Sequence, residues 1–338
     1  MNRLPKNGYG SWAGWPVITT LLLAPSAAEL LTSSTPPTIF FLPSVFPLFL
    51  LLYGAGALLA REIVVRWQKG WPSMLLLGAG YGVIAEGLCA KSFFDPHWRA
   101  LGTLGVYGRW EGVNWLWALG LTLFHSVFSI TLTVFCVYLI FPSLSKRVWL
   151  QRGAFSAIAV LFSSDVVLFI QKGNSYHIPR SYACVTSVAA LAFVVLAYVW
   201  PRRTPRIKKA IPKSPLAFGA LGFLTSGTFL MLLYFFPLLG LPAYLTAFLL
   251  FALALIAGAT LWRWIEGGRE WEPLQQFGLL SGVYGFLALL APFQDFNPGR
   301  PDKVRGMTAV GLATFVGLAL LYRRLSGEKG TSAVPSAM

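Results

Sequence analysis

The chain has 338 residues, of which 56% are hydrophobic and only 12% are charged. An average soluble domain has about 25% charged residues, so this composition excludes an ordinary soluble fold. The net charge of +15 could suggest a nucleic-acid partner, but the basic residues stand between apolar runs and form no single patch. We therefore expect membrane lipids as the surroundings and no nucleic-acid binding.

Apolar runs of about 20 residues, the length that a transmembrane helix needs, recur along the whole chain. A backbone can cross lipid only if its polar groups are paired, so such runs predict an all-α, polytopic helix bundle. We place ten spans, in chain order, at residues 12–33, 45–67, 72–93, 114–141, 149–171, 181–200, 216–236, 241–264, 277–293 and 307–325.

The basic residues predict how this bundle is oriented. Of the 27 Lys and Arg residues, 19 fall in the connections on the side of the N-terminus and 8 on the other side. By the positive-inside rule, both termini are cytoplasmic, and we expect a multi-pass protein of the plasma membrane. Tryptophans at span ends, such as Trp67, Trp149 and Trp264, are typical of an interfacial aromatic belt.

Charge also divides the chain into parts. Residues 1–200 form a membrane half that carries polar intramembrane groups, and residues 201–213 (PRRTPRIKKAIPK) form a basic cytoplasmic connection. Residues 214–326 form a second half with no ionisable side chain in its span centres, which indicates a scaffold. Residues 327–338 are small and polar, and we expect a disordered tail.

Four ionisable side chains lie within the apolar runs of the first half: Glu29, Glu86, His125 and Asp165. Each costs at least a few kcal/mol to place in hydrocarbon, so intramembrane acids and histidines usually mark functional sites. His125 is about eleven residues into its span, which at 1.5 Å per residue is roughly 16 Å deep. The predicted topology places all four in the outer half of the bilayer. We therefore expect them to line one cavity that opens outward.

Helical spacing favours a pair at the centre of this cavity. Glu86 lies on a face of small residues that includes the Gly78–Gly82 GxxxG spacing, which allows another helix to come close. His125 belongs to a polar stripe at helical spacing, with Thr122, Ser126, Ser129 and Thr133. We predict that Glu86 and His125 face each other as catalytic residues, with Thr122 and Ser129 beside them.

The longest outer connection, residues 91–114, joins the spans of Glu86 and His125, so it could act as a lid over the cavity. Its Asp95, His97 and Arg109 are candidate substrate- or ion-binding residues, like Glu29 and Asp165. The chain has only three histidines, and two of them lie in connections, so we expect no metal site. The sequence does not indicate a cofactor.

The order of an acid on one helix and Phe-His on the next resembles the glutamate-type intramembrane proteases, the superfamily of CAAX prenyl endopeptidases and bacteriocin-processing enzymes. That family carries a Glu-Glu pair before a basic residue, then Phe-x-x-x-His, then a second His with Asn or Asp. Here residues 85–91 read AEGLCAK, with one glutamate and a basic residue one position late. Residues 121–125 read LTLFH, with Leu for the leading Phe. No second membrane His follows, so only Asp165 could take its role.

Over residues 72–170, the resemblance implies that Glu86 activates a water together with His125. The residues themselves leave three functions open. The first is an intramembrane hydrolase or transferase acting on a lipid-borne or peptide substrate. The second is a proton- or cation-coupled secondary transporter in which Glu29, Glu86 or Asp165 carries the ion. The third is a structural or assembly subunit. The uncharged second half favours the enzyme, because a site between inverted repeats draws on both halves.

Overall fold

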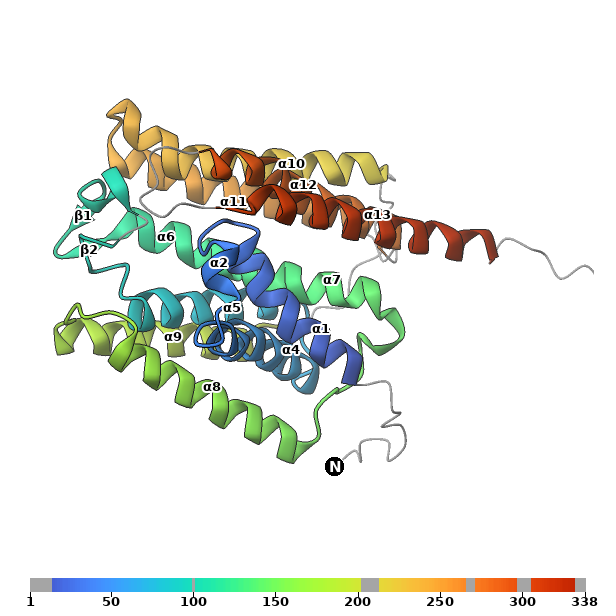
Figure 1. The fold of residues 1–338 in the computed structure, drawn as a ribbon, viewed down its shortest axis with the longest axis horizontal. Helices are drawn as coiled ribbons and strands as arrows, with labels where there is room; N and C mark the ends of the chain where they lie inside the picture. Colours follow the sequence, from blue (N-terminus) through green and yellow to red (C-terminus); the bar gives the residue numbers. More distant parts are fainter. Residues whose placement is uncertain (1–13, 99–100, 202–212, 266–270, 297–304, 332–338) are drawn as a thin grey trace, which may run out of the picture.

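The computed structural model describes residues 14–98, 101–201, 213–265, 271–296 and 305–331. They form a bundle of long helices that run roughly side by side (Figure 1). In this part of the chain, nine helical stretches are long and apolar enough to cross a membrane. The remaining predicted span, residues 12–33, corresponds to α1 (Gly14–Pro25) and its continuation η1 (Ser26–Leu30). The predicted all-α membrane bundle is therefore confirmed.

Three spans of the first half are composite helices. The first consists of α3 (Phe46–Phe49), η2 (Leu50–Ala55) and α4 (Gly56–Arg66), after the short α2 (Pro37–Phe40). The second joins α5 (Trp71–Gly82) to η3 (Val83–Cys89), and the third joins α6 (Trp115–Phe124), η5 (His125–Thr131) and α7 (Leu132–Ile140). Between the second and third lie the 3-10 turn η4 (Gly102–Gly105) and a hairpin of β1 (Arg109–Trp110) and β2 (Val113–Asn114).

The remaining spans follow in chain order after the 3-10 turn η6 (Pro142–Leu144). They are α8 (Arg152–Lys172), α9 (Arg180–Val199), α10 (Pro215–Leu230) with η7 (Met231–Phe235) and η8 (Phe236–Leu239), α11 (Ala243–Ile265), α12 (Pro273–Asp295) and α13 (Met307–Thr331). Because α13 reaches Thr331, the first five residues of the predicted disordered tail are helical, which corrects that boundary. Residues 332–338 and most of the 201–213 connection lie outside the described residues.

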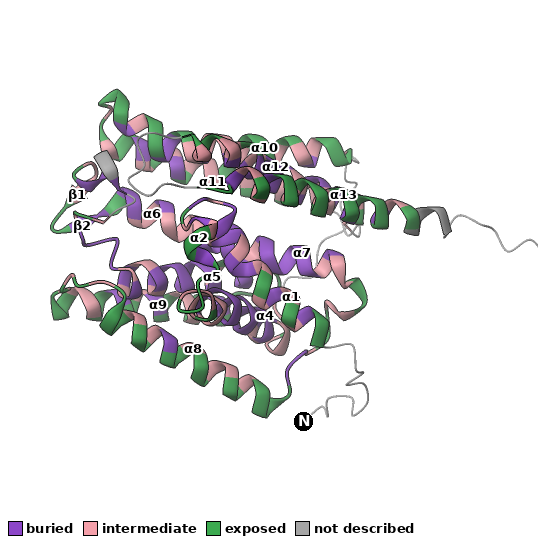
Figure 2. Ribbon diagram, in the orientation of Figure 1, coloured by how far each residue is buried: buried purple, intermediate pink, exposed green. Residues whose placement is uncertain are grey.

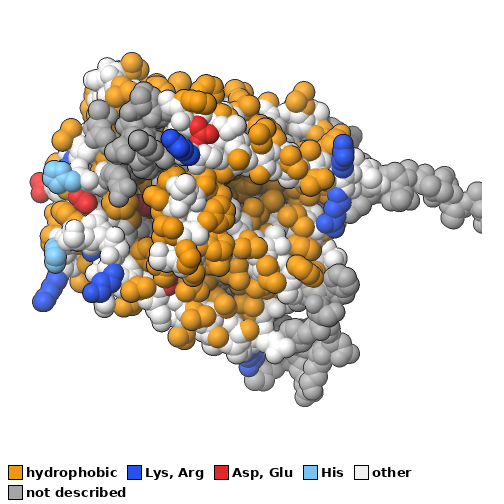
Figure 3. Space-filling view, viewed as in Figure 1, with side chains coloured by type: hydrophobic (Ala, Val, Ile, Leu, Met, Phe, Trp, Pro, Cys, Tyr) orange, Lys and Arg blue, Asp and Glu red, His pale blue; other side chains and the backbone are white. Residues whose placement is uncertain are grey.

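Burial separates the helices into an inner and an outer set (Figure 2). In the spans Phe46–Arg66, Trp71–Cys89 and Trp115–Ile140, 67% of the residues in the most apolar stretch are buried. The same share is 6% in α8 and 11% in α11 and α13. The outer helices therefore present apolar side chains to lipid, and hydrophobic side chains cover the middle of the face in Figure 3. Phe128 and Phe135 share a core cluster with Leu280 of α12 and Leu321 of α13, so the two halves pack together.

A buried ion pair closes the end of the bundle that we predict to be cytoplasmic. Arg61 and Glu62 contact each other and are both fully buried. Arg61 donates to the carbonyl oxygens of Ser145 (2.9 Å) and Arg147 (2.5 Å), and Glu62 accepts from the backbone N–H of Trp149 (2.9 Å). The sequence marked Arg61 only as a topology signal and gave Glu62 no role, although Glu62 lies within the predicted span 45–67.

The orientation stays a prediction of the charge distribution, and reporter fusions test it. The N-terminal end of α10 and the β1–β2 hairpin lie at opposite ends of the bundle (Figure 1). A reporter inserted after Lys213 should therefore be cytoplasmic, and one inserted within residues 101–108 should be external. Activity of both reporters on the same side would contradict the topology.

Candidate functional site

Glu86 of η3 and His125 of η5 form a polar pair inside the bundle. The Nε2 atom of His125 lies 2.9 Å from Oε1 of Glu86, and its Nδ1 atom lies 2.9 Å from Oγ of Ser129. His125 is only 2% exposed, and the Glu86 side chain is 12% exposed. The prediction that Glu86 and His125 face each other is confirmed, and Ser129 joins them. Their catalytic role stays a prediction.

Two glycines allow this close approach. A Cβ added at Gly82 would lie 2.9 Å from the Cβ of His125, and one at Gly78 would lie 2.9 Å from the Cα of Ser126. Contacts of that length are shorter than real Cβ atoms tolerate, so any larger residue would push the helices apart. The hydroxyl of Ser126 also donates to the Leu75 carbonyl at 2.6 Å, across the same contact. The predicted small-residue face of span three therefore packs on span four.

The polar side chains of the site lie in π-helical segments. Glu29 is in η1, Tyr53 in η2, Glu86 in η3, and His125 with Ser129 in η5. A π turn inserts one extra residue into a helix, changes the direction of the side chains that follow it, and is frequent at functional sites. Four helices thus depart from α geometry where they contribute to one polar cluster.

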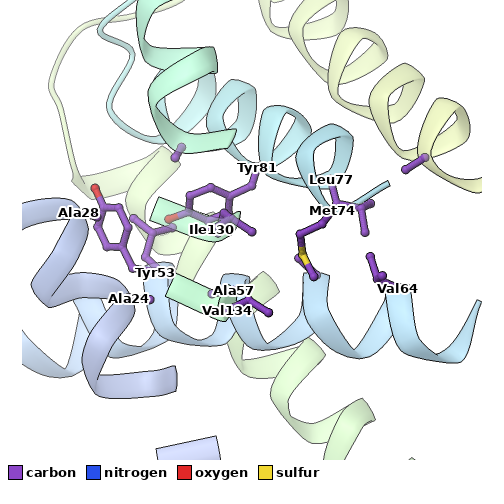
Figure 4. Close-up of a cluster of buried hydrophobic side chains, with 14 of the residues drawn as sticks. Ala24, Ala28, Tyr53, Ala57, Val64, Met74, Leu77, Tyr81, Ile130 and Val134 are labelled. Atoms are coloured by element: carbon purple, nitrogen blue, oxygen red, sulfur yellow. The ribbon is translucent and has the colours of Figure 1, made fainter. Parts of the chain in front are cut away.

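A second carboxylate joins this cluster through a tyrosine. The Tyr53 hydroxyl donates to Oε1 of Glu29, and the Thr35 hydroxyl donates to Oε2 at 2.6 Å. The Tyr53 ring stacks on the His125 ring with 6.1 Å between centroids and 28° between planes. The Tyr81 ring meets His125 edge-on at 5.6 Å. Figure 4 shows both tyrosines at the same end of a buried hydrophobic cluster.

The outer connection closes the site. Ser92 donates its hydroxyl to Oε2 of Glu86 at 2.5 Å and accepts the indole N–H of Trp117 at 3.0 Å. Ser92 is fully buried, as are the neighbouring Phe93 and Phe94. This segment therefore covers the pair, and its role as a lid stays a prediction.

The outer connection packs over the place where we predicted an outward-opening cavity. Its apolar residues Phe93, Phe94, Leu101 and Leu104 share one core cluster with Leu116 and Trp117 at the start of α6. Burying the four large apolar side chains of the connection is more favourable than exposing them. The connection therefore covers the pair, and the cavity stays a prediction.

Three candidates in the connection hold the connection itself and do not reach the pair. Asp95 accepts from Nδ2 of Asn174 (3.0 Å) and from the backbone N–H of His97 (2.9 Å), and the His97 side chain is exposed. Arg109 donates to the carbonyl oxygens of Phe94, Gly105 and Gly112 at 2.8–2.9 Å. The side chains of Asp95 and Arg109 thus hold the connection, and the binding roles of Asp95, His97 and Arg109 stay predictions.

Two further candidates lie apart from the hydrogen-bonded group. Thr122 is half-buried, and its Cα packs beside Gly82. Asp165 is buried on α8, where Sγ of Cys89 lies 3.9 Å from the carbonyl oxygen of the adjacent Val166. Asp165 is close enough to Cys89 and Tyr81 to act on them electrostatically, but makes no hydrogen bond to Glu86 or His125. Three of the four predicted ionisable residues, Glu29, Glu86 and His125, therefore belong to one polar cluster.

The sequence did not identify Tyr53, Ser92 or Trp117 as site residues. Tyrosines and tryptophans are common in membrane helices as belt and core residues, so their type carries little signal. Ser92 directly follows a span, where a serine is ordinary. Among the described residues, no three His, Cys, Asp or Glu side chains are grouped so that they could hold a metal ion.

The comparison with protein families covers almost the whole bundle. A family model matches residues 18–329, which include the polar cluster and both halves of the membrane region. The chain belongs to an uncharacterized membrane protein family. Searches of curated proteins and of solved structures gave no match.

Gly82→Ala tests how the site is assembled. The added methyl group would overlap the Cβ of His125, so the variant should lose about 1–3 kcal/mol of unfolding free energy, as overpacked cores do. Gly153→Ala is the matched control, because nothing lies within 4 Å of a Cβ added there. Unfolding of the purified variants in detergent measures both. Equal stability of the two variants would contradict the close packing at Gly82.

Proposed function

We propose that this membrane protein is an intramembrane enzyme, a hydrolase or transferase, in which Glu86 and His125 act as one catalytic unit. The observation that carries the proposal is the 2.9 Å contact between the two side chains, enclosed at membrane depth. Placing an acid and an imidazole in lipid costs free energy. A hydrogen-bonded carboxylate and imidazole are a common arrangement for general acid–base catalysis.

The hydrogen bonds suggest the role of each group. If Nε2–H of His125 donates to Glu86, Nδ1 accepts from the Ser129 hydroxyl, and every member of the chain has a partner. Glu86 is then the base that takes the proton, and His125 orients the carboxylate through the Nε2–H bond. This division of roles also agrees with the family resemblance stated for residues 72–170.

Ser92 marks where the reacting oxygen would bind. Its hydroxyl lies 2.5 Å from Oε2 of Glu86, at the distance and in the position that a water or a substrate hydroxyl needs for proton transfer to this carboxylate. A substrate would displace Ser92 and with it the buried start of the outer connection. The apolar cover of Phe93 and Phe94 favours a substrate that is itself apolar, either lipid-borne or a membrane peptide, entering from the predicted outer side.

Single and double substitutions test the catalytic unit. Glu86→Gln and His125→Gln should each lower turnover by about 10²- to 10⁴-fold, the usual contribution of a general base. The double variant should be no worse than the poorer single variant, because the two residues act together. The measurement is product release, by mass spectrometry, from liposomes that contain the purified protein, defined lipids and a peptide library.

Glu111→Gln is the matched control, since Glu111 is an exposed acid of the same outer connection and should not affect turnover. The same liposomes report proton- or sodium-driven uptake. Coupled flux that survives His125→Gln but is lost with Glu29→Gln would contradict the enzyme and indicate a secondary transporter.

A further inference from the structure

Helix α8 buries a single residue, and that residue is an aspartate. Only 6% of the apolar window of α8 is buried, so nearly all of this helix faces lipid. Asp165, 3% exposed, is the one fully buried side chain along its length, which the structure describes in full. The acid of this lipid-facing helix thus points into the bundle and away from lipid.

Asp165 meets no cation of the protein. Among the described residues, neither of its carboxylate oxygens has a hydrogen-bond partner, and none of the ion pairs includes it. Lys91, which acts electrostatically on the nearby Cys89, donates to the Asn174 carbonyl at 2.7 Å. A buried carboxylate without a partner is costly, so its charge must be neutralised by something else.

A second orphaned oxygen lies on the neighbouring helix. The Tyr81 hydroxyl of α5 also has no hydrogen-bond partner among the described residues, and Tyr81 is 5% exposed. Tyr81 and Asp165 are within electrostatic reach of each other, and the Phe162 ring, one turn before Asp165, lies 6.4 Å from the Tyr81 ring. Two unsatisfied oxygen-bearing groups thus lie on α5 and α8, which pack together at the Tyr81 and Phe162 rings.

We propose that Asp165 and Tyr81 form a binding site for a small monovalent cation, a proton or Na⁺, between α8 and the core. Oxygen atoms are the ligands that hard cations prefer. A single positive charge balances the single carboxylate. The other titratable groups nearby do not supply a second negative ligand: Glu86 is bonded to His125 and Ser92, Glu29 to Tyr53 and Thr35, and Cys89 is a thiol.

Occupancy of this site holds α8 on the bundle. With the cation bound, Asp165 is neutral and α8 can stay docked. Without it, the bare charge favours movement of Asp165 toward the polar interface. Asp165 makes no hydrogen bond to Glu86 or His125, and Tyr81 meets His125 only through its ring. The proposal therefore does not rest on the enzymatic function proposed above.

Thermal unfolding of the purified full-length protein in detergent tests the site, because a ligand that binds only the folded state raises the Tm. The protein is heated in NaCl and in choline chloride of equal ionic strength, each at an acidic and an alkaline pH. Asp165→Asn keeps the shape of the side chain but removes the charge. Tyr81→Phe removes only the hydroxyl, and Ser164→Ala, at an exposed neighbour on α8, is the matched control.

If the bound cation is Na⁺, the Tm of the wild type and of Ser164→Ala is several degrees higher in sodium than in choline at alkaline pH. If the bound cation is a proton, their Tm is higher by a similar amount at acidic than at alkaline pH and does not respond to sodium. In either case Asp165→Asn removes the response and Tyr81→Phe weakens it. If Asp165→Asn responds to both pH and sodium as the wild type does, the site does not exist.

Discussion

The hydrogen bond between Glu86 and His125 joins an acid and an imidazole in a region surrounded by lipid, where each alone would cost at least a few kcal/mol. The surrounding architecture follows from making this contact. Gly78 and Gly82 remove the side chains that would keep the two helices apart. The π-helical segments redirect Glu86 and His125 toward each other. The inward fold of the outer connection brings Ser92 to the remaining carboxylate oxygen of Glu86.

The buried polar groups of the first half have two different tasks. At the inner end, Arg61 and Glu62 are saturated by backbone groups of residues 144–150, so they fasten the connection between α7 and α8. At the outer end, Asp95, Asn174 and Arg109 fasten the two outer connections in the same way. The second half packs through glycines, such as Gly282 against Gly219, and supports this region without charge.

The sequence predicted the bundle, its spans and the facing of Glu86 and His125, because hydrophobic length and small-residue spacing are local properties. It could not predict which way the outer connection folds, since that depends on the apolar surface that α6 offers to Phe93 and Phe94. It also missed the π turns, which have no known sequence signature and which bring Tyr53 against His125. Arg109 and Asp95 are residue types that often act in functional sites. Here they form hydrogen bonds to backbone carbonyls and to an asparagine. Residue type could not distinguish these uses.

Nitrogen NMR of protein labelled only at histidine tests the Glu86–His125 contact most directly, because the chain has just three histidines. His97 and His177 are exposed and His125 is enclosed. The contact predicts one ring whose nitrogen signals report a single, hydrogen-bonded tautomer. Glu86→Gln should change the signals of that ring alone. Three rings with the same nitrogen signals, or a His125 spectrum unchanged by Glu86→Gln, would contradict the account.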